Sequence, residues 1–362
     1  MISVVCGLYF HTMKPRKSYF RQNIDAIDGY TPGEQPRDMK YVKLNTNENP
    51  YPPSPAVAKA LKSFCSDRLR LYPDPLACEL RKTIADIFGL KSENVIVGNG
   101  SDDILTIATR AFAGENDAIA SFEPSYSLYP VLAELQGCSC IKIHLKFDGD
   151  FSIPANSAEK AEAAKLFYIA RPNAPTGTLF PIDEIRKICR KFKGVVFVDE
   201  AYADFADDNC VGLLREFPNL IVGRTLSKSY ALAGLRLGYA LASEKIIGGM
   251  MKVKDSYNVG MLVQAIAVAA LKDKKYFNET KKKICRTRAF LVESLTVKGF
   301  KVCGSQSNFV FASPADKDGE GLYRHLKKNG VLVRYFKGPV TGRYVRITVG
   351  TDSEIKTLLK FI

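Results

Sequence analysis

The feature that most constrains the fold of this chain is a series of short apolar runs between about residues 94 and 242. The run at 195–199, Val-Val-Phe-Val-Asp, is continuous and rich in β-branched residues, as is typical of a strand buried on both faces of a parallel sheet. Similar runs, with helical stretches such as 182–191 between them, occur at 94–97, 118–121, 165–170, 220–224 and 237–242. This alternation predicts an α/β fold with a mostly parallel, mixed sheet and helices on both faces.

The length of the chain, 362 residues, exceeds the usual size of one domain, so a large and a smaller domain are expected. Beyond residue 245 the pattern changes to two long helical stretches at 246–272 and 274–299. Shorter strands and helices follow at 309–312, 319–328, 331–334, 344–348 and 353–361. We predict an N-terminal arm over 1–40, a large domain over 41–255, and linking helices with a small α+β domain over 256–362.

The chain is basic, with a formal net charge of +14, but no nucleic-acid-binding motif accompanies this charge. The densest cluster, eight Lys and Arg residues between Lys272 and Arg288, fits the solvated face of a long helix. We therefore expect no nucleic-acid partner. A positive field would attract anionic substrates such as phosphate esters.

The apolar runs and the cysteines bear on location. No apolar run is long enough to cross a bilayer, so no membrane association is expected. The nine cysteines are scattered without the spacing of a zinc site, and their odd number argues against a full set of disulfides. These features favour a reducing, cytoplasmic location and no metal. Residues 1–12 lack the charged start and cleavage site of a signal peptide.

One stretch, from Arg224 to Gly238, concentrates chemically active side chains. Lys228 lies between two serines and near two arginines, so like charge disfavours its ammonium form. A lysine of this kind is a candidate amine nucleophile that can form a Schiff base. The hydroxyls of Thr225 and Ser227, with the guanidinium of Arg236, are suited to binding a phosphate.

A carboxylate, Asp199, ends the predicted strand at 195–199, and Tyr202 follows three residues later. Open α/β sheets bind ligands at the carboxyl ends of their strands. A carboxylate there can hold a cationic ring nitrogen, and a tyrosine can hold a phenolic oxygen. Together with a Schiff-base lysine, these are the needs of pyridoxal phosphate.

Two further turns complete the pattern. Gly98-Asn-Gly-Ser-Asp102 opens a predicted helix, whose free N–H groups can receive a phosphate, and Arg171-Pro-Asn-Ala-Pro-Thr-Gly177 follows another apolar run. Together these motifs resemble the fold-type I pyridoxal-phosphate-dependent aminotransferases, and within them the histidinol-phosphate aminotransferases. The likeness extends from about Tyr30 to the C-terminus. Residues 1–12 precede it, which suggests an upstream start codon or a disordered extension.

The resemblance implies pyridoxal 5′-phosphate as the cofactor and a role for each matching residue. Lys228 would bind the cofactor covalently and act as general acid and base, Asp199 would pair with the ring nitrogen, and Tyr202 would donate to the phenolic oxygen. Tyr126 would stack on the ring. The phosphate would be held by Gly100, Ser101, Asp102, Thr225, Ser227 and Arg236, with Tyr72 contributed by the second subunit of a homodimer.

The resemblance also implies the reaction. The amino group of L-histidinol phosphate would pass to 2-oxoglutarate, giving imidazole acetol phosphate and glutamate in histidine biosynthesis. Histidinol phosphate has no α-carboxylate, so its phosphate would take the place of the carboxylate of glutamate. The matching positions near the substrate are Tyr30, Arg334 and Arg346 for the anion, and Asn47 and Glu48, with Glu48 facing the imidazole.

One position departs from the family pattern. The family usually has Asn immediately before Pro in the turn at 171–177, where it donates to the phenolic oxygen, and this chain has Ala174. Two alternatives follow: the turn shifts so that Asn173 reaches the ring, or Tyr202 serves alone. Losing one neutral hydrogen bond would cost on the order of 1 kcal/mol.

Other functions fit the sequence less well. An aromatic or general amino-acid aminotransferase is the first alternative, and a phosphothreonine decarboxylase of similar fold is the second. A binding or regulatory module is disfavoured because Lys228, Asp199 and Arg236 are all present. A Rossmann dehydrogenase is disfavoured because no predicted strand leads into Gly-x-Gly-x-x-Gly.

Overall fold

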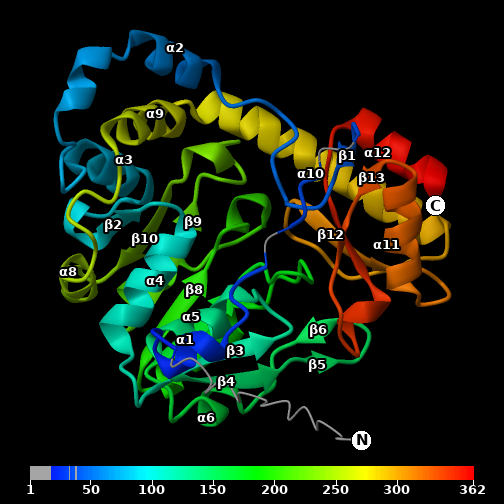
Figure 1. The fold of residues 1–362 in the computed structure, drawn as a ribbon, viewed down its shortest axis with the longest axis horizontal. Coiled ribbons are helices and arrows are strands. Elements are labelled where there is room, and N and C mark those ends of the chain that lie inside the picture. Colours follow the sequence, from blue (N-terminus) through cyan, green and yellow to red (C-terminus); the bar gives the residue numbers. More distant parts are fainter. Residues whose placement is uncertain (1–17, 32, 37–38) are drawn as a thin grey trace, which may run out of the picture.

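A seven-stranded sheet forms the centre of the computed structural model, which describes residues 18–31, 33–36 and 39–362 (Figure 1). Its strands are β2 (Val95–Gly98), β3 (Ala118–Glu123), β4 (Ser139–His144), β7 (Leu166–Ala170), β8 (Val195–Asp199), β9 (Leu220–Thr225) and β10 (Gly238–Ala242). Their order is β2-β10-β9-β8-β7-β3-β4. β10 runs antiparallel to both of its neighbours, and the other pairs are parallel. The predicted mostly parallel, mixed sheet is confirmed.

Helices cover both faces of this sheet. They are α3 (Cys78–Phe88), α4 (Ser101–Phe112), α5 (Leu128–Gln136), α7 (Ile182–Lys191), α8 (Glu244–Met251) and α9 (Met261–Lys272). Successive residues of a strand point to opposite faces. Val95 and Val97 accordingly pack in the cluster that holds α3, α7 and α9, and Ile96 packs in the cluster that holds α4, α5 and α8. The last residues of β7, β8 and β9, Ala170, Asp199 and Thr225, line a cavity.

Two predictions about elements were wrong. The edge strand β4 was missed, because its Ser-Cys-Ile-Lys-Ile-His sequence is only partly buried and lacks a continuous apolar run. The predicted single helix over 246–272 is two helices, α8 and α9. Between them the Asn258 amide donates to Val97 O (3.0 Å) and to Asp103 Oδ2 (3.1 Å), and these bonds hold an extended loop against β2 and α4.

A second, antiparallel sheet forms the other part of the molecule. Its strands, in the order β11-β12-β15-β14, are β11 (Lys301–Val302), β12 (Phe309–Ser313), β15 (Val345–Thr348) and β14 (Arg334–Tyr335). The long helix α10 (Lys274–Val297) runs from beside α9 to this sheet, where α11 (Gly319–Lys328) and α12 (Asp352–Leu358) also lie (Figure 1). Six of the eight basic residues of the cluster at 272–288 are exposed, as predicted.

The segment before α2 joins the two parts. β1 (Val42–Lys43) pairs with β13 (Val331–Leu332), so the predicted strand over 331–334 is divided between β13 and β14. From β1 the chain continues through residues 45–49, beside the larger sheet, into α2 (Pro55–Ser63). The remaining α-helices and strands are α1 (Gln22–Ala26), α6 (Ser157–Lys160) and the hairpin of β5 (Lys146–Phe147) and β6 (Phe151–Ser152).

Two further observations concern the described residues. No helix in that part of the chain combines the length and the apolar character needed to span a membrane. Its eight cysteines are all free thiols. The predicted extension, residues 1–12, lies outside the described residues.

Candidate active site

A cavity of about 280 Å³ lies where the carboxyl ends of β7, β8 and β9 face the second sheet. Fourteen of the predicted site residues line it, namely Tyr30, Asn47, Glu48, Ser101, Asp102, Tyr126, Asp199, Tyr202, Thr225, Ser227, Lys228, Arg236, Arg334 and Arg346. These residues come from segments more than 300 positions apart in the sequence, from Tyr30 to Arg346. The fold therefore gathers in one cavity most of the residues that the sequence motifs singled out.

Lys228 lies in the turn that follows β9. Its Nζ donates to Thr46 O (3.2 Å) and lies 5.9 Å from the centre of the Tyr202 ring. Burial, with the positive charge of Arg346 second, lowers the pKa of Lys228 to about 8. The sequence suggested like charge as the cause, and the structure adds burial as the larger one. A substantial fraction of this amine is neutral near neutral pH, as a nucleophile requires.

Asp199 ends β8 and is 6% exposed. One carboxylate oxygen accepts from the Tyr129 hydroxyl (3.0 Å) and the other from Ala201 N–H (3.1 Å). Burial raises the pKa of Asp199 to about 6. Among the described residues no Lys or Arg pairs with it. A buried carboxylate that borders a cavity without a cationic partner suits a ligand that carries its own positive charge.

Beside Lys228, a group of hydroxyls, a helix N-terminus and an arginine forms a cup for an anion. Thr225 Oγ1 lies 3.0 Å from Ser227 Oγ, and α4 begins directly after Gly100. Gly100 has φ +91° and does not itself line the cavity, but a Cβ at this position would lie 2.4 Å from Arg236 Nη2. The glycine lets the guanidinium lie against the helix N-terminus, where N–H groups and cation both favour a phosphate.

An acidic and an aromatic side chain border the same cup. Asp102 accepts from the Tyr126 hydroxyl (3.1 Å) and from Arg236 Nη2 (3.3 Å). These contacts hold the Tyr126 ring at the wall of the cavity, where it was predicted to stack on a ligand ring.

The opposite end of the cavity holds two arginines. Arg346 on β15 donates to Asn45 O (3.0 Å), and its guanidinium lies over the rings of Phe309 (5.2 Å) and Phe336 (5.3 Å). Its Nε has no hydrogen-bond partner among the described residues. Arg334 lies 5.5 Å from the centre of the Phe336 ring. A second anion would therefore be bound at this end, away from the cup at Arg236.

Glu48 and Tyr30 complete this end. Glu48 accepts from Lys43 Nζ (2.7 Å) and Thr46 Oγ1 (2.8 Å). Burial favours a higher pKa, but these two hydrogen bonds and the positive charges of Lys43 and Lys228 together outweigh it and lower the pKa of Glu48, which stays ionised. The Tyr30 ring packs edge-on against Tyr126, 5.9 Å between ring centres, so it connects the two ends of the cavity.

Asn173 is the predicted cofactor residue that the structure turns away from the cavity. It is fully buried, its amide donates to Pro124 O (3.1 Å) and Thr176 Oγ1 (3.0 Å), and its oxygen accepts from Ser125 Oγ (2.9 Å). Ala174 lines the cavity in its place. The shifted turn is therefore not observed, and of the two alternatives the one in which Tyr202 serves without Asn173 fits this arrangement.

Tyr72 also lies outside the cavity of its own chain. It is 79% exposed and its ring stacks on Tyr257, 4.5 Å between ring centres. The structure of one chain therefore does not bring Tyr72 to the residues of the predicted phosphate site.

Known proteins were compared with this chain. The family model for aminotransferase class I and II matches residues 39–362. This chain belongs to the class I and II aminotransferases. Two curated relatives are similar to it at 43% identity: the histidinol-phosphate aminotransferase of Rippkaea orientalis, over 94% of this chain and 97% of that protein, and that of Geobacter sulfurreducens, with the same coverage.

Solved aminotransferase structures have the same fold. The histidinol-phosphate aminotransferase of Sinorhizobium meliloti, solved in complex with pyridoxal-5′-phosphate, superimposes with a TM-score of 0.85 over 95% of this chain and 96% of that one, at 22% identity. The aspartate aminotransferase of Thermus thermophilus, solved with maleate, superimposes with a TM-score of 0.78 over 89% and 90%, at 20% identity. The predicted α/β aminotransferase fold is confirmed.

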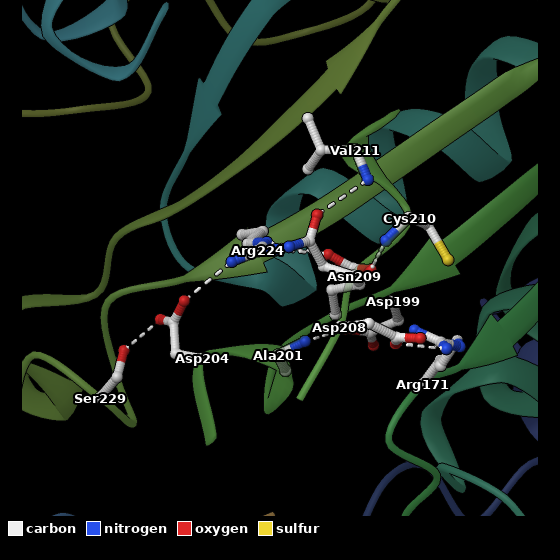
Figure 2. Close-up of polar contacts among 11 residues, drawn as sticks. Arg171, Asp199, Ala201, Asp204, Asp208, Asn209, Cys210, Val211, Arg224 and Ser229 are labelled. Atoms are coloured by element: carbon white, nitrogen blue, oxygen red, sulfur yellow. Dashed lines mark hydrogen bonds and ion pairs between the residues drawn. The ribbon is translucent and has the colours of Figure 1, made fainter. Parts of the chain in front are cut away.

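Behind the site of this aminotransferase lies a buried ionic network that the sequence motifs did not predict. Glu200 follows Asp199, and its Oε2 accepts from Arg224 Nε (3.0 Å) and Nη2 (2.6 Å). Arg224 Nη1 donates to Asp204 Oδ1 (2.8 Å), and Ser229 Oγ donates to Asp204 Oδ2 (2.5 Å). Figure 2 shows this series of contacts from Ser229 through Asp204 to Arg224. At one end of the network Glu200 is adjacent in sequence to Asp199, and at the other end Ser229 is adjacent to Lys228.

Two other residues of the site were also missed. Tyr129 hydrogen-bonds Asp199, and Phe336 lies between the two arginines. Tyr126 precedes α5 and Tyr129 lies in its first turn, and the two rings pack edge-on, 5.6 Å between ring centres. The closeness of Tyr129 to Tyr126 in the sequence was the signal available for it. Phe336 lies in a short loop after β14 and has no local signal in the sequence.

Proposed function

We propose that this aminotransferase transfers the amino group of L-histidinol phosphate to 2-oxoglutarate, giving imidazole acetol phosphate and glutamate. The observation that carries the proposal is a single cavity with Lys228 and a cation-free Asp199 at its centre and a separate anion site at each end. One anion site suits a cofactor phosphate and the other suits the anionic group of a substrate. The names of the curated relatives support the choice of substrate.

The residues present fit pyridoxal phosphate. Asp199 would keep a proton on the ring nitrogen, Tyr126 would pack on the ring, and the cup formed by Ser101, Thr225, Ser227 and Arg236 would bind the phosphate, with Gly100 leaving room for the guanidinium. When bound, the cofactor supplies a carbonyl carbon that accepts the amino group and a ring that withdraws electrons from the substrate.

Lys228 has two tasks in this proposal. Its neutral amine, favoured by a pKa of about 8, attaches the cofactor before substrate arrives. Once released by an incoming substrate amine, Nζ would take the proton from the substrate Cα and hold it for return to the carbon at which the amino group is exchanged. The contact with Thr46 O marks the position of a free amine at the cavity wall.

Arg346 and Arg334 determine which substrates fit. Both are at the end of the cavity opposite the phosphate cup, and both lie over Phe336, which limits their movement. We assign to this pair the phosphate of histidinol phosphate in one half-reaction and a carboxylate of 2-oxoglutarate or glutamate in the other. Glu48, which is ionised, offers an acceptor to an imidazole N–H.

A homodimer is part of the proposal. Five exposed large apolar side chains lie close together in the sequence, at Leu61, Leu69, Leu71, Tyr72 and Leu76, and Tyr257 stacks on Tyr72. Contact between two copies through this region would bury it and would bring Tyr72 to the phosphate cup of the second copy. We also assign the cavity to the junction of a large domain, 41–255, with a C-terminal part, 256–362, and we place the enzyme in the cytoplasm.

The test is a comparison of amino donors. With pyridoxal phosphate and 2-oxoglutarate present, glutamate formation should be at least tenfold faster in kcat/KM with L-histidinol phosphate than with L-phenylalanine. Arg334→Gln should reduce kcat/KM for histidinol phosphate, whereas Arg343→Gln, an exposed arginine outside the cavity, should not. Faster turnover of phenylalanine would favour a general aminotransferase, and carbon dioxide release from phosphothreonine without 2-oxoglutarate would favour a decarboxylase.

A further inference from the structure

We infer that Asn47 orients the Tyr202 hydroxyl so that its proton is donated into the cavity, which supplies the hydrogen bond that Ala174 cannot make. The inference rests on the proposed function, in which Tyr202 faces the phenolic oxygen of the cofactor. It makes Asn47 a positioning residue that acts through Tyr202, in place of the contact with substrate that the resemblance implied.

The contacts of Asn47 leave its side chain little freedom. The residue is 1% exposed and has φ +56°, a left-handed conformation that Asn tolerates better than most residues. Its backbone N–H donates to Thr348 Oγ1 (3.0 Å), and its backbone oxygen accepts from Asn308 Nδ2 (3.0 Å). Both partners belong to the side of the second sheet, so Asn47 is anchored there.

The same anchors fix the orientation of the Asn47 amide. The Thr348 hydroxyl, which accepts from Asn47 N–H, donates its own proton to Asn47 Oδ1 (3.1 Å). With Oδ1 on Thr348, the amide nitrogen is directed at the Tyr202 hydroxyl, at 3.0 Å. An amide nitrogen can only donate, so the Tyr202 oxygen accepts and its own proton is directed elsewhere.

The proton of the Tyr202 hydroxyl is free to be donated to a ligand in the cavity. Among the described residues, the Tyr202 hydroxyl has no hydrogen-bond acceptor. Tyr202 borders the cavity, and its ring packs edge-on against Phe309, 5.0 Å between ring centres, which limits rotation of the side chain. The hydroxyl is thus held as a donor toward a ligand in the cavity. Because Ala174 has no polar side-chain atom and Asn173 is turned away, the turn at 171–177 offers no side-chain donor here.

The experiment is a double-mutant cycle on the loaded enzyme. Asn47→Asp keeps the size of the side chain but places an acceptor beside Tyr202, which draws the phenol proton away from the cavity. Tyr202→Phe removes the hydroxyl, and the double variant shows what the new charge does without it. The readouts are the dissociation constant of pyridoxal phosphate and the pH midpoint of its visible absorbance band.

A donor to the phenolic oxygen stabilises its anionic form, so losing the donor raises this pH midpoint. We expect Asn47→Asp to raise it by about one unit and to weaken cofactor binding about tenfold when Tyr202 is present, and to do much less when residue 202 is Phe. Asn47→Gly accepts the left-handed conformation without strain and removes the amide. It should produce a smaller shift in the same direction, and it provides a second measurement if Asn47→Asp does not fold.

Two results would overturn the inference, and they differ. If Tyr202→Phe shifts the band but the Asn47 variants have the same effect in both backgrounds, Asn47 does not act through Tyr202 and the proposed function stands. If Tyr202→Phe changes neither the band nor the affinity, the placement of Tyr202 against the cofactor is itself wrong.

Discussion

At the scale of single residues, the site is built from charged groups that the fold buries with few partners. Asp199 borders the cavity with two neutral hydrogen-bond donors, Tyr129 and Ala201 N–H, and Lys228 has one carbonyl partner. Burying a charge without a counter-charge costs free energy unless a ligand supplies it. The cofactor-free protein therefore carries a cost that binding removes.

Asp199→Asn should stabilise the cofactor-free protein. The pKa of Asp199 is about 6 in the folded state against a usual 3.8, so between these values the folded protein binds more protons than the unfolded chain. The stabilising contribution of the protonated form is present below about pH 4 and is lost as the pH rises through 6. At pH 7.5 the variant should be more stable by up to about 3 kcal/mol, and at pH 4 the two proteins should be equal. Urea unfolding at both pH values measures this, and a less stable variant at pH 7.5 would contradict it.

The capture of pyridoxal phosphate should depend on the ionisation of Lys228. Only the neutral amine reacts, so the rate should rise with pH and level off above about 8, the pKa of this residue. Arg346→Gln removes a positive charge that lowers this pKa, so the midpoint should move to higher pH. Stopped-flow absorbance from pH 6 to 10 measures the rate, with the exposed Arg343→Gln as control. A rate independent of pH would show that the amine is already neutral.

At the scale of elements, the ends of β8 and β9 and the turn after β9 are held together from behind. Arg224 is the centre of that arrangement, because it bonds Glu200 next to Asp199 and, through Asp204, Ser229 next to Lys228 (Figure 2). A buried ion pair is weak support for stability as a whole, but removing one member leaves a buried charge. This network therefore helps to position Asp199 and Lys228. Removing one of its members should lower the free energy of unfolding considerably.

Arg224→Ala should destabilise the protein by about 3–5 kcal/mol, because Glu200 would remain buried without the cation that it pairs with. Arg186→Ala breaks a more exposed pair with Glu216 and should destabilise the protein much less. Chemical unfolding of both variants gives the comparison. An equal decrease in the free energy of unfolding in both variants would show that the buried network contributes no more to stability than the exposed pair.

The same scale shows what the sequence can and cannot predict. Most strands of the larger sheet were predictable because an apolar run is a local signal in the sequence. The residue pattern of α7 is also local, and this helix was predicted with its observed bounds. The break between α8 and α9 was not, since it depends on Asn258 reaching β2 and α4. The orientation of Asn173 likewise depends on Pro124 and Ser125, about 50 residues earlier. Motifs identify the residues of a site, and long-range contacts decide how those residues point.

At the scale of the whole molecule, the cavity belongs to both sheets. Arg334 and Arg346 come from the second sheet, Lys228 and Asp199 from the larger one, and residues 45–49 bond to both sides. The proposed homodimer adds a further contribution, Tyr72. Substrate and cofactor binding should therefore respond to changes far from the cavity.

Leu71→Glu should weaken the dimer and the retention of the cofactor together, because an exposed apolar residue becomes charged in the proposed interface. Val297→Glu, at the exposed end of α10, is the matched control and should leave both unchanged. Sedimentation velocity and cofactor content after dialysis are the measurements. Tyr72→Phe should keep the dimer and lose part of the affinity for the cofactor. A Leu71→Glu protein that is still dimeric would place the interface elsewhere.

The measurement that tests the central proposal most directly is the visible spectrum of the cofactor-loaded protein in two additions. L-histidinol phosphate alone should abolish the absorbance band of the bound cofactor, and 2-oxoglutarate, added after the free substrate is removed, should restore it. Lys228→Ala should show neither change at a comparable rate. A band that histidinol phosphate leaves unchanged, while phenylalanine abolishes it, would contradict the assigned substrate and leave a general aminotransferase.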